Sequence, residues 1–237
     1  MSEMENSGKN KTIVISLGGS LLIPDEIDTG FVKNFKSLID EQLQKGISFI
    51  IVVGGGKIAR KYIEAGAALD SMDDEDKDWL GIHATRMNAH FIRAVFRKDA
   101  FAKINKDPEN LEEFKSSGNN LLIAAGWKPG NSTDFVAVSL TKNLGSKKVI
   151  NLSNIDYVYD KDPGKFFTAK AIKETTWEEF RKMVGETWSP GMNAPFDPIA
   201  SKLADEEGME VAIMNGKDMD NLKAYLEGRE FKGTMIR

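Results

Sequence analysis

The chain has 237 residues, a length that fits one large α/β domain or two lobes that share one sheet. Its 32 Lys and Arg residues nearly balance its 36 Asp and Glu residues, so the charge predicts no polybasic surface for nucleic acid. The absence of cysteine excludes disulfides, cysteine metal sites and thiol catalysis, and it fits a cytoplasmic protein. No apolar stretch is long enough to cross a membrane, and the small, polar residues 1–11 predict a disordered tail rather than a signal peptide.

Two strand–glycine–helix arrangements open the chain. In the first, the apolar strand Thr12–Leu17 leads into two glycines and then a helix over Phe31–Lys45. In the second, the β-branched run Phe49–Val53 predicts a strand buried on both faces, followed by Gly54–Gly56 and a helix with apolar side chains at helical spacing. Such turns let the backbone approach a ligand and direct N–H groups at an anion. Phosphate binding is the preferred interpretation, although glycine also serves simply to make tight turns.

An acidic segment precedes a long amphipathic helix. Residues 70–78 are mostly carboxylates, which predicts a solvated loop at the entry to the helix. The helix itself is predicted over Trp79–Phe96, with Met87 on its buried stripe. His83 and His90 lie seven residues apart on nearly the same face, and without a third ligand nearby they favour packing or interface roles over a metal site.

The second half of the chain continues the alternation of strands and helices. Further strands are predicted over Leu121–Ala125, Lys148–Leu152 and Glu210–Met214, a helix over 197–208 with Asp197 as its cap, and a short edge strand within Phe231–Ile236. This order predicts a mostly parallel sheet with helices on both faces. Ligands of such sheets bind beyond the carboxyl ends of the strands, where the polar loops gather.

The two glycine loops emerge at one edge of this sheet, so they suit a phosphate donor and a phosphate acceptor that face each other. Phosphoryl transfer needs that geometry, because the protein contributes mainly positioning and charge neutralisation. The sequence has no Walker A motif, no protein-kinase motif set and no hydrolase nucleophile elbow. Residues 54–59 match the loose dinucleotide fingerprint Gly-x-Gly-x-x-Ala, so a Rossmann oxidoreductase stays as an alternative.

Six motifs then carry a resemblance to a known family. They are Gly18–Ser20, Val52–Lys57 with Ala59–Glu64, Gly81–Ala89, Pro129–Asp134, Asn154–Asp156 with Val158, Tyr159, Asp162 and Pro163, and Phe196–Lys202. In this order they resemble the archaeal-type uridylate (UMP) kinases of the amino-acid kinase superfamily, over essentially Thr12–Arg237.

The resemblance implies a three-layer αβα sandwich on a mostly parallel, eight-stranded sheet. Residues 12–140 would form mainly the acceptor (UMP) lobe and residues 141–237 mainly the ATP lobe, usually assembled as a homo-oligomer, a hexamer. The implied reaction transfers the γ-phosphoryl group of ATP to UMP with Mg²⁺, giving UDP and ADP; no metal ligand is assigned on the chain.

The resemblance also implies residue roles. The expected ATP-binding residues are Gly19, Ser20, Gly56, Arg60, Ser153, Tyr159 and Asp162. The expected UMP-binding residues are Gly55, Asp78, Trp127, Lys128, Pro129, Gly130, Asn131, Ser132 and Thr133. The expected catalytic residues are Arg60, Asp134 and Lys202.

These roles are chemically coherent, because the phosphate of UMP is largely ionised near neutral pH and needs no catalytic base. It needs screening of two anions that repel each other, from backbone N–H groups, Arg60, Mg²⁺ and Lys202. Asp134 would orient those groups or the metal, or equally cap the helix that follows it. Lys57 is equally compatible with a solvated lysine beside its loop.

Three features depart from the family pattern. Tyr157 stands where the family usually has Gly, which affects the nucleotide loop. Ser16 occupies a position where relatives often carry Asp or Lys, so a catalytic charge is absent there. The segment 188–196 has no clear counterpart and fits either a lid or a structured loop.

Other functions of the same fold remain open. A kinase for isopentenyl phosphate or an acyl amino acid is one; isopentenyl phosphate kinases carry a histidine just after the second glycine loop, which residues 58–60 lack. A nucleotide- or oxyanion-binding storage protein is another. Turnover of UMP with ATP would separate all of these.

Overall fold

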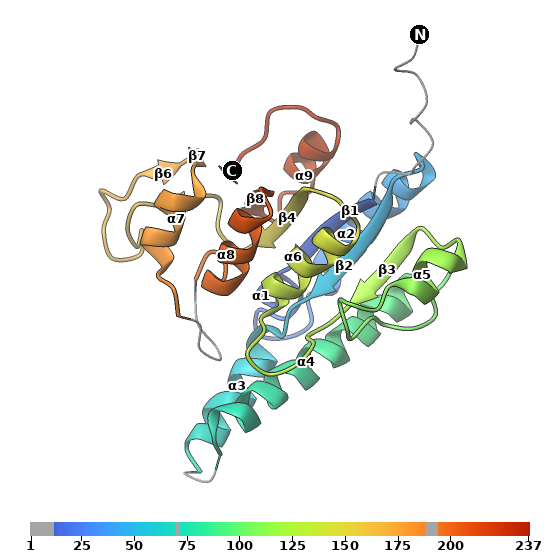
Figure 1. The fold of residues 1–237 in the computed structure, drawn as a ribbon, viewed down its shortest axis with the longest axis horizontal. Coiled ribbons are helices and arrows are strands. Elements are labelled where there is room, and N and C mark those ends of the chain that lie inside the picture. The colour runs from blue at the N-terminus through green and yellow to red at the C-terminus, as the bar shows by residue number, and fades with distance from the viewer. Residues whose placement is uncertain (1–11, 70–71, 188–193) are drawn as a thin grey trace.

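A computed structural model describes residues 12–69, 72–187 and 194–237, so the expected tail over residues 1–11 lies outside the described residues (Figure 1). In that part of the chain, seven strands form one sheet in the order β3-β2-β1-β4-β8-β9-β7, and β5 pairs with β6 separately. The strands of the large sheet are β1 (Thr12–Leu17), β2 (Ser48–Val53), β3 (Leu121–Ala124), β4 (Lys148–Ser153), β7 (Glu174–Thr175), β8 (Glu210–Asn215) and β9 (Thr234–Ile236). The small sheet contains β5 (Val158–Tyr159) and β6 (Ala171–Ile172).

The large sheet is parallel except where β9 runs antiparallel to β8. Every residue of β2 is buried, as the unbroken apolar run predicts for a central parallel strand. The α/β class and the mostly parallel sheet are therefore confirmed. The described sheet has seven strands rather than the expected eight. Strand β9 was expected at the edge of the sheet but lies between β8 and β7, and β7 is the edge strand.

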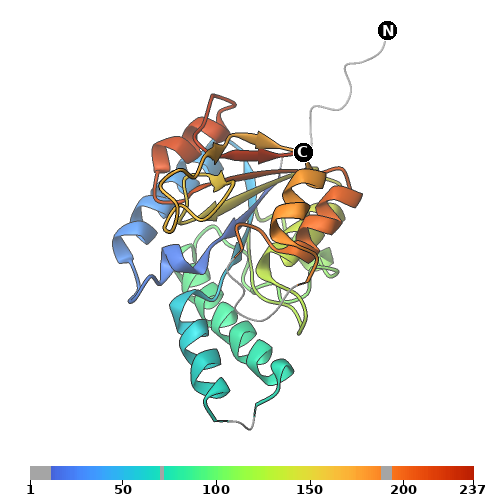
Figure 2. The ribbon, with the colours of Figure 1, turned by 90° about the vertical axis from the view of Figure 1, so that its left-hand side faces the viewer.

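Nine helices connect the strands in the described residues: α1 (Gly19–Leu22), α2 (Thr29–Gln44), α3 (Gly56–Ala67), α4 (Asp74–Val95), α5 (Glu112–Ser117), α6 (Thr133–Asn143), α7 (Trp177–Val184), α8 (Pro198–Glu206) and α9 (Met219–Leu226). They make two layers around the sheet. One apolar cluster joins α2, α4 and α9 to one face of the sheet, and a second joins α5, α6, α7 and α8 to the other. Figure 2 shows α2 and α9 on one side of the sheet and α7 and α8 on the opposite side, which is the expected three-layer arrangement.

Helix α4 begins earlier than the sequence predicts. Asp73 caps it by accepting a hydrogen bond from the backbone N–H of Asp76, so residues 74–78 are helical and the prediction of a loop up to residue 78 is wrong there. The reason is that carboxylates are favourable in the first turn of a helix, where the helix dipole is positive. Met87 was expected on the buried stripe but is 72% exposed; the buried stripe instead contains Ile82 and Ile92.

Helices α3 and α4 pack together and extend beyond the sheet as an antiparallel pair, which both ribbon views show (Figures 1 and 2). None of the helices in the described residues is long and apolar enough to cross a membrane.

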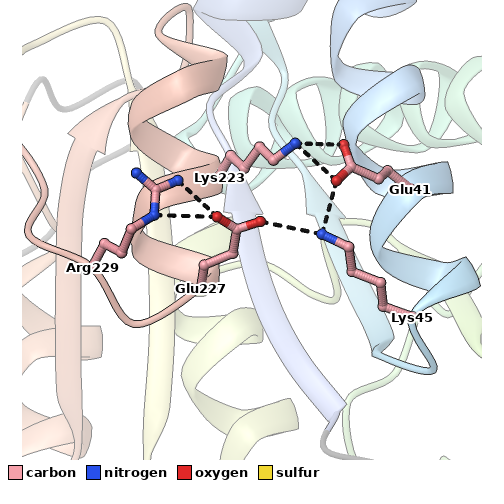
Figure 3. A network of polar contacts seen from close by, with 5 residues as sticks. All are labelled: Glu41, Lys45, Lys223, Glu227 and Arg229. Carbon is pink, nitrogen blue, oxygen red and sulfur yellow. Dashed lines mark hydrogen bonds and ion pairs between the residues drawn. The ribbon is translucent and has the colours of Figure 1, made fainter.

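A network of ion pairs connects α2 to α9 and the segment after it (Figure 3). The ammonium of Lys223 lies 2.8 Å from Glu41, and Lys45 lies 2.8 Å from Glu41 and 3.2 Å from Glu227. Arg229 contacts Glu227 at 2.7 Å. The hydrogen bonds from Lys223 and then Lys45 lower the pKa of Glu41 to about 2. The network therefore joins two segments that are 182 residues apart in the chain.

Candidate functional site

A cavity of about 260 Å³ lies beyond the carboxyl ends of β1, β2 and β3. It is the place where a parallel sheet of this kind binds its ligand. The expected site residues that line it are Gly19, Ser20, Gly55, Gly56, Arg60, Asp78, Asn131, Ser132, Thr133 and Asp134. Residues predicted for the donor, for the acceptor and for catalysis thus share one cavity.

The two glycine loops pack directly against each other at this cavity. A Cβ on Gly19 would lie 2.0 Å from the backbone nitrogen of Gly56, and a Cβ on Gly54 would lie 2.6 Å from the backbone nitrogen of Gly19. Gly56 also has a φ of +67°, which side chains rarely adopt. The close contact of the two loops therefore requires glycine at these positions.

The contact leaves backbone donors at the cavity. The N–H groups of Gly19, Ser20, Gly55 and Gly56 donate to no acceptor within residues 12–69, 72–187 and 194–237. Two of them lie at the start of α3, where the helix dipole adds partial positive charge. Arg60, one turn further along α3, also lines the cavity and has an exposed side chain. The arrangement suits a phosphate group.

Asp134 also lines the cavity and is held by three neutral donors. Its Oδ1 accepts from the hydroxyl of Ser16 at 2.8 Å and from the amide of Asn151 at 3.0 Å. Its Oδ2 accepts from the backbone N–H of Asp197 at 3.3 Å. Burial, with a smaller contribution from the nearby charge of Asp197, raises the pKa of Asp134 to about 6, against the lowering effect of the hydrogen bonds from Ser16 and from the Asp197 N–H.

The alternative role of Asp134 as a helix cap is wrong. Ser132 caps α6 by accepting a hydrogen bond from the backbone N–H of Phe135 at 3.1 Å. Asp134 therefore lies in the first turn of α6, and its side chain is not needed as the cap. Ser16, the position that lacks a charge, supplies a hydroxyl to this carboxylate instead.

Asp197 was predicted only as a helix cap. It does cap α8, accepting from the backbone N–H of Ala200 at 2.7 Å, but it also lines the cavity. Its Oδ2 is buried and has no hydrogen-bond partner within the described residues. Burial is the main reason that the pKa of Asp197 is raised. The two carboxylates, Asp134 and Asp197, therefore lie side by side.

Helix α4 holds the loop that follows β3. Asp78 is buried and accepts from the backbone N–H of Gly130 at 2.6 Å; burial raises its pKa, and this hydrogen bond opposes the increase. Thr85 accepts from the backbone N–H of Gly126 at 2.8 Å. Arg86 donates to the carbonyl oxygens of Gly126 and Trp127 at 3.3 and 2.7 Å. The loop is thus bound to α4 at several points.

The rest of this loop lies beside the cavity rather than in its lining. Trp127, Lys128, Pro129 and Gly130 are absent from the lining residues, and the Lys128 ammonium lies 3.8 Å from the centre of the Trp127 ring. Gly130 has a φ of +81° and reaches the site through its bond to Asp78.

The residues expected at the nucleoside end of ATP also lie outside the cavity. Ser153 ends β4, Tyr159 belongs to β5, and the exposed Asp162 accepts from the backbone N–H of Gly164 at 2.8 Å. Tyr157 lines a separate cavity of about 690 Å³ that also contains Asp218.

Two of the predicted basic residues point elsewhere. Lys202 on α8 has an exposed side chain 3.9 Å from Glu206 and does not line the cavity. Lys57 forms an ion pair with Asp25. The ring of His83 lies beside that of Trp79, with 6.0 Å between the ring centres and a tilt of 31°. No group of three or more His, Cys, Asp or Glu side chains that could hold a metal occurs in the described residues.

Comparison with known proteins gives relatives that match this chain along most of its length. A model of the amino acid kinase family matches residues 11–215. The uridylate kinase of Hyperthermus butylicus is 32% identical over 224 residues, covering 94% of this chain and 97% of the relative. The uridylate kinase of Thermoplasma volcanium is 34% identical over 230 residues, covering 96% and 98%.

A solved structure agrees. The crystal structure of uridylate kinase from Archaeoglobus fulgidus superposes with a TM-score of 0.81 at 28% identity, covering 96% of this chain and all of that one. Sequence and fold therefore agree that this chain belongs to the amino acid kinase family and, within it, to the uridylate kinases.

Proposed function

We propose that this protein is a UMP kinase, which transfers the γ-phosphoryl group of ATP to UMP and gives UDP and ADP. The observation that carries the proposal is that the backbone donors of both glycine loops and the carboxylates of α4 and α6 line one and the same cavity. Uridylate kinase relatives that match along nearly the whole chain support the choice of substrates.

The acceptor side of the cavity suits a nucleoside monophosphate. Asp78 has an Oδ1 that is not used by Gly130, so it can accept a hydrogen bond from a ribose hydroxyl. The polar residues 131–133 and the N–H of Gly55 complete a wall for the phosphate and the base. Trp127, Lys128 and Pro129 would enclose the base from the adjoining loop.

The transfer itself requires positioning rather than a general base. The phosphate of UMP is already largely ionised at neutral pH, so it attacks without losing a proton to the protein. The N–H groups of Gly19, Ser20 and Gly56 would hold the transferring group, and Arg60 would neutralise the charge that develops on it. Lys202, Ser153, Tyr159 and Asp162 lie outside the cavity, and we propose that they contact the part of ATP that extends beyond it.

Mg²⁺ fits the carboxylate pair. Asp134 and Asp197 line the cavity, one Asp197 oxygen is buried without a partner in the described residues, and neutral donors alone satisfy Asp134 there. Mg²⁺ is usually held by one or two carboxylates together with substrate phosphates. When bound, it supplies charge neutralisation between the two phosphate groups. Asp134 and Asp197 would hold it, which makes Asp134 the residue that orients the metal.

The homo-oligomer, expected as a hexamer, stays a proposal, as does the cytoplasmic location. One surface feature supports a second copy of the chain. Ile58, Tyr62 and Met87 are apolar and 36%, 56% and 72% exposed, and they line a groove of about 570 Å³ beside α3 and α4. Exposed apolar patches of this kind mark interfaces.

The test is a coupled assay of ADP release with purified protein, ATP and Mg²⁺. We expect UMP to be phosphorylated far faster than AMP, GMP or isopentenyl phosphate, with UDP as the product. Formation of no UDP above background would contradict the proposal. Faster turnover of isopentenyl phosphate would identify the other kinase, and nucleotide binding without turnover would identify a storage protein.

A further inference from the structure

Asn88 on α4 forms hydrogen bonds with the backbone of the second glycine loop. The residue is 4% exposed, and its amide nitrogen donates to the carbonyl oxygens of Gly54 at 2.9 Å and Gly55 at 3.1 Å. Both neighbours are acceptors, so only the amide NH₂ group fits this place, and both of its protons are used. We propose that Asn88 is a positioning residue that aims the anion-binding donors of this loop.

Peptide geometry explains how one side chain does this. In a planar trans peptide, the carbonyl and the N–H of the same unit point in opposite directions. Binding the carbonyl of Gly54 therefore directs the N–H of Gly55 away from Asn88, and binding the carbonyl of Gly55 does the same for the N–H of Gly56. These are two of the donors that line the cavity and lack an acceptor in the described residues.

The loop needs an external anchor because its own residues constrain it little. Glycine has wide backbone freedom, and three glycines in sequence can rotate their peptide planes at low cost. The two ends are held by hydrogen bonds from Gly54 N–H to Leu17 and from Lys57 N–H to Ile23, at 2.9 and 3.2 Å. Among residues 12–69, 72–187 and 194–237, the side chain that holds the peptides between these ends is that of Asn88. Donors fixed before the ligand arrives need no reorganisation during transfer.

If Asn88 had a purely structural role, its replacement would change a different property of the protein. A buried asparagine that only satisfies its own hydrogen bonds would affect the stability of the fold and leave anion binding unchanged. Thr141 provides that comparison, because it is fully buried on α6, donates to the carbonyl of Ala137 at 2.8 Å and lies outside the cavity. Thr141→Val therefore serves as the matched control.

The first measurement is the binding of pyrophosphate, by calorimetry, to wild-type protein, Asn88→Ala, Asn88→Ser and Thr141→Val. We expect Asn88→Ala to bind pyrophosphate about tenfold more weakly. Asn88→Ser, which keeps one donor, should lie between Asn88→Ala and wild type, and Thr141→Val should bind like wild type. If Asn88→Ala does not fold, the comparison of Asn88→Ser with Thr141→Val decides.

The second measurement is kinetic and rests on the proposed UMP kinase activity. Asn88→Ala should lower kcat by about 10- to 100-fold, because the N–H of Gly56 would hold the transferring group, and it should also raise the KM for UMP, because the N–H of Gly55 would bind the UMP phosphate; Thr141→Val should change neither. Failure of wild-type protein to phosphorylate UMP would refute the proposed function, yet the pyrophosphate result would still test Asn88. Wild-type pyrophosphate affinity in both Asn88 variants, with only a lower melting temperature, would refute the inference and leave a packing role.

Discussion

Replacing Asp134 with asparagine should stabilise the ligand-free protein at high pH while it abolishes activity. Asp134 lies among the neutral donors Ser16 and Asn151 and beside a second carboxylate, Asp197. In the absence of ligand, its negative charge is therefore buried without a compensating cation in the described residues. An amide of the same shape removes that charge and keeps an oxygen for Ser16 and Asn151.

The magnitude follows from the pKa. Its increase from 3.8 to about 6 is about 2 pH units, and each unit corresponds to about 1.4 kcal/mol, so ionisation costs the folded state about 3 kcal/mol above pH 6. The amide in Asp134→Asn would lose the 3.3 Å bond from the Asp197 N–H, which costs about 1 kcal/mol. The expected net gain in the free energy of unfolding at pH 8 is about 1–2 kcal/mol. For a chain of this size it raises Tm by about 2–8 °C.

The sign of the pH dependence is fixed by the direction of the shift. Below pH 3.8 the carboxyl is protonated in both the folded and the unfolded state, so ionisation contributes no difference between wild type and Asp134→Asn. As the pH rises through 3.8 towards 6, the unfolded state loses its proton first, and wild-type stability falls. The advantage of Asp134→Asn should therefore grow between about pH 4 and pH 7 and then stay constant.

The assay is thermal unfolding of ligand-free protein at several pH values, with Asp99→Asn as the control. Asp99 is exposed and has no part in the cavity, so its variant should follow wild type at every pH. Activity with UMP should be lost in Asp134→Asn, together with any stabilisation of the protein by Mg²⁺–ATP. An Asp134→Asn protein that is less stable than wild type at pH 8 would refute the reasoning.

Two further substitutions test the cavity. Arg60→Ala should lower kcat by about 10-fold or more, because the charge that develops on the transferring group loses its partner. Arg60→Lys should recover little activity, because a point charge does not replace the planar guanidinium. Lys61→Ala is the exposed control, and full activity in Arg60→Ala would show that Arg60 is only a surface charge. Asp78→Ala should raise the KM for UMP about tenfold or more, leave kcat within a few-fold and narrow the preference for UMP over dUMP, because its bond to the ribose exists in ground and transition states alike. Asp78→Asn keeps an acceptor for the Gly130 N–H and so isolates the effect of the charge, and Asp76→Ala is the exposed control. Wild-type KM and UMP/dUMP selectivity in Asp78→Ala would leave Asp78 with no role beyond its hydrogen bond to Gly130.

The fold could be predicted because its signals are local. The unbroken apolar run before Gly54 became β2, whose residues are all buried, and the Asp197-Pro198 pair starts α8 as expected. The two glycine loops meet at one cavity because the strands that deliver them, β1 and β2, are parallel neighbours in register, with Leu17 opposite Val53. Alternation of strand and helix was enough to predict that meeting.

The surroundings of Asp134 could not be predicted in this way. Its partner Ser16 is 118 residues away in the chain, and Asn151 lies in β4, where apolar neighbours defined the strand. Asp197 satisfied a local rule as a helix cap, and that interpretation concealed its second place in the cavity. A polar residue near the carboxyl end of an apolar strand is the signal that would have found Asn151, because the ligand site lies at that end.

Helix α4 shows why a hydrophobic stripe is an incomplete description of a buried helix face. Its buried positions include the apolar Ile82 and Ile92 but also Asp78, Thr85 and Asn88. Ile92 packs in the apolar cluster against the sheet and Ile82 lines the cavity, whereas the polar positions bind the backbone of two loops. Loops near a sheet edge have few partners for their backbone N–H and carbonyl groups, and buried groups of this kind must be satisfied. A helix that covers both sheet and loops must therefore carry polar side chains on its inner face, and those side chains determine the shape of the site.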